Sequence, residues 1–235
     1  MIVDISQYNF EESLTRIDQM LNLQTMETEP LESIPELNKI PMKGGVMANC
    51  SIMQVELITP SSRDHGALLR VYRTFLSEAV SIVSSHIHCV DVMTLGSRLI
   101  AVFSTPFKKN IESLIDKTAM VNTLAQVISK KTQGMGLPSI TVRIGVDFGE
   151  AMLMRLGKYD VNEQYPSGLA WMGSPVNKAS ELIGKPGHGM NIWISNVIYL
   201  NLSDDYKKFF HQDAESGDYG ADIINTQMKS WINKQ

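Results

Sequence analysis

The order of strand-like and helix-like segments between residues 48 and 149 constrains this fold more than any other feature. Residues 140–148 alternate apolar and polar side chains, which is the pattern of a half-buried β-strand. Upstream, the pattern predicts helices at 68–83 and 110–131 and strands at 48–58, 88–95 and 98–103. The order strand, helix, strand, strand, helix, strand predicts an α+β fold with a ferredoxin-like βαββαβ core, an antiparallel sheet with helices on one face.

Further segments extend this core toward the C-terminus. Residues 152–156 are expected to return as the hairpin partner of the strand at 140–148. Strands are also predicted at 169–172 and 191–195, and helices at 175–183 and 197–200. We therefore expect a main domain at 44–202 and a C-terminal extension at 203–235.

An N-terminal helix is predicted at residues 9–22, with Asn9 as its cap. Phe10, Leu14, Ile17 and Leu21 follow helical spacing and form one apolar face. Two interpretations of this face stay open: the helix packs on the domain's own core, or it is contributed to a partner chain. The Glu- and Pro-rich stretch that follows indicates an acidic linker, so residues 1–43 are expected to lie outside the main domain.

Charge and hydropathy argue against two classes of partner. The formal net charge is −4, without a basic block, so no nucleic-acid partner is expected. The sequence has neither ~20 consecutive apolar residues nor a signal-peptide pattern, so we expect a cytoplasmic protein without a membrane partner. Cys50 and Cys89 lack CxxC spacing, and His65, His86 and His88 lack ligand spacing with a carboxylate cluster. These three histidines are expected on helix surfaces or in loops.

Four segments, taken in order, resemble the catalytic domain of class III nucleotidyl cyclases. They are 92–103 (VMTLGSRLIAVF), 140–153 (ITVRIGVDFGEAML), 171–182 (WMGSPVNKASEL) and 187–195. A closer resemblance is to the stand-alone bacterial cyclases of the Pycsar antiphage systems, which make cyclic pyrimidine nucleotides. It is carried by 14–22 (LTRIDQMLN), 48–51 (ANCS), 171–173 and 219–232 (YGADIINTQMKSWI).

The resemblance implies a dimer with sites at the interface between two protomers. In such cyclases one protomer supplies two aspartates that hold two divalent ions, Mg²⁺ or Mn²⁺. These ions activate the ribose 3′-hydroxyl and neutralise the triphosphate, while the other protomer positions the nucleotide. The implied partners are therefore a nucleoside triphosphate and a second cyclase-fold chain, in a homodimer or a heterodimer.

Both metal positions depart from the family pattern. Glu56 stands at the first aspartate, with its carboxylate one methylene further out, and in the loop after it Pro60 lacks a backbone donor. The second aspartate would follow Gly96, but Ser97 stands there, and a neutral hydroxyl is a weak ligand for a hard cation. Gly96 and Arg98, on either side of Ser97, are candidate nucleotide contacts. The two degenerate positions predict impaired metal-dependent chemistry.

The complementary half of the site is mixed. Asn177 matches the family asparagine at the start of a helix, where it either orients the ribose, as a candidate catalytic residue, or caps the helix. Four residues on, Glu181 stands where many cyclases carry an arginine, and a carboxylate there repels phosphate. Arg143 and Arg155 are further candidate phosphate contacts, although Arg143 is expected to be exposed or ion-paired.

Three functions are consistent with these residues. The first is a pseudo-cyclase without metal-dependent chemistry that serves as a binding or regulatory partner in cyclic-nucleotide antiphage signalling. The second is an active cyclase that converts UTP or CTP to the 3′,5′-cyclic monophosphate and pyrophosphate, with Glu56 and either Asp91 or Asp147 at a rearranged metal site. The third is an interaction module without a nucleotide pocket. The joint change of both metal positions and the loop favours the first.

Overall fold

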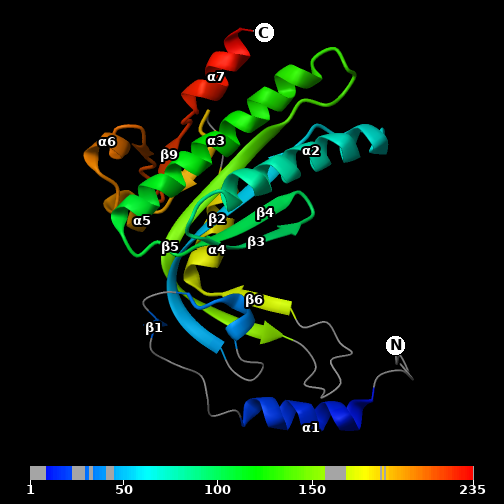
Figure 1. The fold of residues 1–235 in the computed structure, drawn as a ribbon, viewed down its shortest axis with the longest axis vertical. Helices are drawn as coiled ribbons and strands as arrows, with labels where there is room; N and C mark the ends of the chain where they lie inside the picture. Colours follow the sequence, from blue (N-terminus) through cyan, green and yellow to red (C-terminus); the bar gives the residue numbers. More distant parts are fainter. Residues whose placement is uncertain are drawn as a thin grey trace.

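The computed structural model describes residues 9–22, 30–31, 34–40, 45–156, 168–185, 187 and 189–234. At its centre lies a β-sheet (Figure 1). The strand order of this sheet is β3-β4-β2-β5-β7-β9-β8. The core elements are β2 (Gly45–Ile58), α2 (His65–Ser84), β3 (Cys89–Leu95), β4 (Arg98–Phe103), α3 (Lys108–Thr132) and β5 (Thr141–Leu156). These pair antiparallel in the ferredoxin-like order, so the predicted α+β fold is confirmed.

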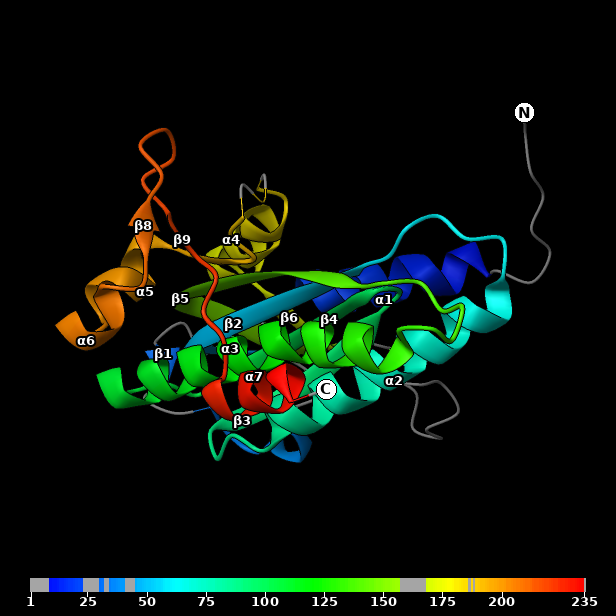
Figure 2. The ribbon, with the colours of Figure 1, turned by 90° about the horizontal axis from the view of Figure 1, so that it is seen from above.

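The sheet has two covered faces, and they differ in what covers them. On one face Met53, Val55 and Leu57 of β2 pack with α2 and α3 in the main apolar core. On the other face Ile52 packs with Ala179 of α4 (Ser174–Ile183) in a smaller cluster. Figure 2 shows α2, α3 and α7 (Thr226–Asn233) on one side of the sheet and α4 on the other. Because successive side chains of β2 point to opposite faces of the sheet, this one strand contributes to both apolar cores.

Strand β5 is longer than the sequence pattern indicates. Residues 152–156 do not turn back on residues 140–148 but continue the same strand, which stays paired with β2 from Thr141 to Met154. The predicted hairpin partner is therefore wrong. The antiparallel partner of the second half of β5 is β6 (Gly168–Met172), which occupies the strand predicted at 169–172.

The sheet continues beyond residue 202. Strand β7 (Ile192–Ile194) pairs parallel with β5, β9 (Tyr219–Ala221) pairs with β7, and β8 (His211–Gln212) pairs with β9. The remaining short elements are β1 (Pro30–Leu31), the 3-10 helix η1 (Leu37–Lys39), α5 (Asn196–Leu200) and α6 (Asp204–Lys207). The domain boundaries given above stay predictions.

Helix α1 (Phe10–Leu21) begins where expected, because the Asn9 side chain accepts a hydrogen bond from the Glu12 amide. It lies at the opposite end of the molecule from α7 (Figure 1). The side chains of its apolar face are exposed, from 40% at Leu14 to 79% at Leu21. Of the two interpretations, the exposure favours a helix offered to a partner. In the described part of the chain, no helix is both long and apolar enough to span a bilayer.

Candidate functional site

The first metal position is occupied by an ion pair. Glu56 lies near the end of β2, and Arg98, the first residue of β4, is its direct cross-strand partner. The Arg98 Nε donates to the Glu56 Oε1 at 3.1 Å, with the two side chains 42% and 23% exposed. At such exposure an ion pair stabilises the fold by no more than about 1 kcal/mol. Its consequence is local: one oxygen of the Glu56 carboxylate already accepts a hydrogen bond from a guanidinium group.

The second position lies in the turn between β3 and β4. Gly96 has φ +60°, so the turn uses the left-handed conformation that glycine adopts at little cost. The carbonyl of Ser97 accepts a hydrogen bond from the Leu57 amide at 2.9 Å, which ties the turn to β2. The turn therefore brings Ser97 beside the Glu56–Arg98 pair, but the side chain it supplies is an uncharged hydroxyl.

The two divalent ions that the family implies do not fit these residues. Hard cations need several oxygen ligands with negative charge. Here one carboxylate is paired with an arginine and the second position is neutral. The described ranges contain no group of three or more His, Cys, Asp or Glu residues that could hold a metal ion.

The strand register also separates the alternative carboxylates. Asp147 lies opposite Ile52 on β2, four residues from the level of Glu56, or about 13 Å at about 3.3 Å per residue. Asp91 pairs with Val102 at that same distant level and accepts a hydrogen bond from the Trp171 Nε1 at 2.9 Å. Within one protomer, a site of paired metals about 4 Å apart cannot be built from Glu56 with either aspartate.

Asn177 lies in the first turn of α4 with its side chain exposed. The N-cap is Gly173, whose φ is +136° and where a Cβ would meet the Glu150 carbonyl oxygen at 2.9 Å. The capping interpretation of Asn177 is therefore wrong. Its role toward a nucleotide stays a prediction, and the exposed amide leaves it available for one.

Polar groups next to Asn177 link α4 to the C-terminal strands. Lys178 donates to Glu181 at 2.9 Å and to the buried Asp218 at 3.0 Å, and Lys185 lies 2.9 Å from the same Asp218 carboxylate. Asp147 is buried nearby, and this burial raises the pKa of its carboxyl. Sequence reasoning missed this network, because its members are distant in the chain and follow no motif.

Other residues singled out in the sequence make structural contacts. Arg155 donates to the carbonyl oxygens of Ile40 at 3.0 Å and Leu37 at 2.6 Å, which holds the segment before β2. His86 lies in the turn between α2 and β3, one of the two kinds of position expected for it, and it is buried there against Phe103. Burial also raises the pKa of the Cys50 thiol to about 12, which keeps that cysteine a protonated core residue.

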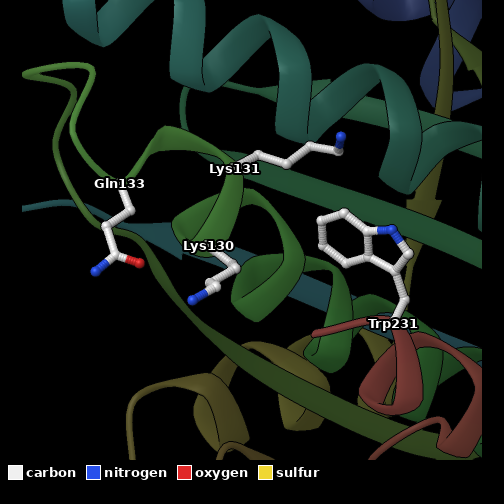
Figure 3. Close-up of a pocket in the computed structure, with 4 residues that line it drawn as sticks. All are labelled: Lys130, Lys131, Gln133 and Trp231. Carbon is white, nitrogen blue, oxygen red and sulfur yellow. The ribbon is translucent and has the colours of Figure 1, made fainter. Parts of the chain in front are cut away.

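A hollow of about 390 Å³ lies at the C-terminal end of α3, lined by Lys130, Lys131, Gln133 and Trp231 (Figure 3). Lys131 and Trp231 point toward one another, with the ammonium 4.9 Å from the indole centroid. The two lysines also lie in the last turn of α3, where positive charge stabilises a helix end. Because α3 covers the opposite face of the sheet, this hollow is separate from Glu56 and Arg98.

The chain is similar to two curated proteins over nearly its whole length. It is 26% identical to a uridylate cyclase of Treponema porcinum over 98% of this chain and 82% of that protein. It is 27% identical to a uridylate cyclase of Gulbenkiania mobilis over 96% of this chain and 95% of that protein. This similarity supports the expected resemblance to nucleotidyl cyclases. No protein-family model matches the sequence.

The same fold is found in solved structures of cyclases. The guanylyl cyclase Cya2 matches it with a TM-score of 0.60 and 14% sequence identity, over 77% of this chain and 95% of that one. The likeness supports the fold. The feature that the sequence did not predict is the pairing of Glu56 with Arg98. No local signal could have found it, because the turn sets Arg98 opposite Leu95 of β3, and only the register between β2 and β4 sets it opposite Glu56.

Proposed function

We propose that this chain is a pseudo-cyclase: a member of the uridylate cyclase group that binds a nucleoside triphosphate in the cytoplasm without cyclising it. The observation that carries the proposal is the Glu56–Arg98 ion pair at the first metal position. A two-metal mechanism needs carboxylates to hold the ions that activate the 3′-hydroxyl and neutralise the triphosphate. An arginine that already neutralises Glu56 competes with the ion for that charge.

The test is a turnover assay on the purified full chain. UTP, CTP, ATP and GTP are each incubated with Mg²⁺ or Mn²⁺, and cyclic products are separated by chromatography. We expect no cyclic nucleotide above the level of a protein-free control. A cyclic product that Glu56→Ala abolishes contradicts the proposal and supports the second candidate, an active pyrimidine cyclase. That candidate is favoured by the match to two uridylate cyclases over almost the whole chain.

The partner of this pseudo-cyclase is, in our proposal, a second copy of the same chain. Phe10, Leu14, Ile17 and Leu21 of α1 are exposed at intervals of four, three and four residues, the spacing of a coiled-coil seam. In an antiparallel pair of helices, Glu11 of one copy would face Asp18 of the other, and the two negative charges would repel. The charges therefore favour a parallel pair. A helix of 12 residues is marginal alone, so it adds to a larger dimer interface.

Sedimentation velocity at micromolar concentration tests this partner. The wild-type chain is expected to sediment as a dimer, and a Leu14→Ser, Ile17→Ser double variant to shift toward monomer. The exposed polar Gln19→Ser is the matched control on the same helix and should leave the dimer unchanged. A wild-type monomer contradicts the homodimer. Co-purification with a different cyclase-fold chain would indicate a heterodimer and a regulatory role in cyclic-nucleotide antiphage signalling.

A further inference from the structure

Two arginines flank Glu56 in one row across the sheet. Arg98 on β4 and Arg143 on β5 are both direct cross-strand partners of Glu56 on β2. Direct partners in antiparallel strands project from the same face, so the three side chains share one surface. The Cα atoms of the two arginines are two strand spacings apart, about 9.6 Å. Both long side chains can therefore reach a group held above Glu56.

The row carries a net positive charge. Glu56 neutralises one arginine through the Arg98 Nε, and that geometry leaves the two terminal amino groups of Arg98 free to donate. In the described part of the chain, no side-chain hydrogen bond or ion pair holds the guanidinium of Arg143, which is half-buried. One carboxylate and two guanidinium groups sum to one positive charge at the place where the family holds its cations.

Among the residues that the structure describes, the neighbouring side chains do not cancel this charge. Ser97, beside Arg98, is neutral where the family has an aspartate. Asp147 on the same face is about 13 Å along the strand, and Glu181 of α4 is already paired with Lys178. Glu56 therefore acts as a positioning residue that fixes the orientation of Arg98, rather than as a ligand of a metal ion.

We propose that Arg98 and Arg143 take the place of the two metal ions and bind the triphosphate of a nucleotide directly. This inference rests on the proposed function, because it specifies how the pseudo-cyclase holds its ligand. A guanidinium presents a planar fork of donors that matches two phosphate oxygens, and it keeps its charge at any physiological pH. Binding is thereby independent of divalent ions, and the neutral Ser97 removes a repulsion that an aspartate would impose.

Calorimetric titration of the full chain with UTP, in excess EDTA and again in Mg²⁺, tests the inference. We expect binding in EDTA, and competition by inorganic tripolyphosphate, which lacks base and ribose. Arg98→Gln and Arg143→Gln should each weaken binding by about tenfold to a hundredfold, as loss of a charge-assisted hydrogen bond implies. Arg98→Lys, which keeps the charge but not the fork, should weaken it less. Arg73→Gln, at an exposed position on α2, is the control and should change nothing.

The direction in which Glu56→Gln changes the affinity for UTP distinguishes the two roles of Glu56. If Glu56 positions Arg98 in a metal-free site, the variant raises the row to two positive charges and binds UTP in EDTA at least as tightly as wild type. If Glu56 is a metal ligand, the variant weakens binding, and binding requires Mg²⁺. Absence of UTP binding in EDTA, an unchanged Arg98→Gln variant, or no competition by tripolyphosphate also overturns the inference. A cyclic product in the turnover assay, found together with UTP binding in EDTA, overturns the proposed function but not this inference.

Discussion

Gly145→Ala should separate α4 from the sheet. Gly145 lies in the middle of β5, under the C-terminal half of α4. A Cβ there would lie 2.9 Å from the Leu182 Cβ and 3.1 Å from the Ile183 amide nitrogen, and closer still to the Ala179 carbonyl oxygen. Two of these three atoms belong to the backbone, which a rotamer change cannot move. Overpacking of this kind costs about 3 kcal/mol, the upper part of its usual range.

Urea denaturation followed by circular dichroism measures this loss, with thermal melting as a second readout. For a chain of this size, about 3 kcal/mol corresponds to a melting temperature lower by roughly 6–12 °C. Gly149→Ala is the matched control on the same strand, because its nearest neighbours are atoms of Pro175 and Ser174 at 3.6–3.8 Å, an ordinary contact distance. If both variants are equally stable, the close approach of α4 to β5 is not as described.

Three further changes test other contacts. Burial lowers the pKa of His86, so the unfolded chain binds its proton at higher pH than the folded chain. Stability should therefore fall as the pH drops below about 6.5, and fall less in His86→Gln, as urea titrations at several pH values would register. Trp171→Phe removes the hydrogen bond to Asp91 and should lower the free energy of unfolding by about 1 kcal/mol in the same assay. Asp218→Asn leaves Lys178 without a buried counter-charge and should cost about 3 kcal/mol, with thermal melting as the measurement.

The fold was predictable where one side chain pattern decides one element. The strict alternation around Val142, Ile144 and Val146 and the periodicity of α2 and α3 reflect burial on one face, and the structure confirms all three elements. The continuation of β5 was not predictable in this way. Residues 149 and 150 are a glycine and a glutamate, a composition that also suits a turn, and only pairing with β2 keeps the strand extended.

At the candidate site, the hairpin turn was predictable from the sequence but the ion pair beside it was not. The spacing around Gly96 and Ser97 located the turn, because a hairpin is a local structure. The ion pair depends on the register between β2 and β4, which joins residues 42 positions apart. Likewise, the network on Asp218 depends on how the last strands return to α4. Sequence spacing does not encode such distances unless the pairing is already known.

The ion pair implies that restoring the family's aspartates would not by itself restore a metal site. In a Glu56→Asp, Ser97→Asp variant, Arg98 is still the cross-strand partner of residue 56 and the chain neighbour of residue 97, so it competes with the cation for the charge of the carboxylates. We therefore expect little Mn²⁺ binding by electron paramagnetic resonance in this double variant, and measurable binding once Arg98→Gln is added. Arg73→Gln in the same background serves as the charge-matched control. Strong Mn²⁺ binding by the double variant alone would show that Arg98 does not exclude the ion, and the loss of metal would then follow from the two side chains at 56 and 97 only.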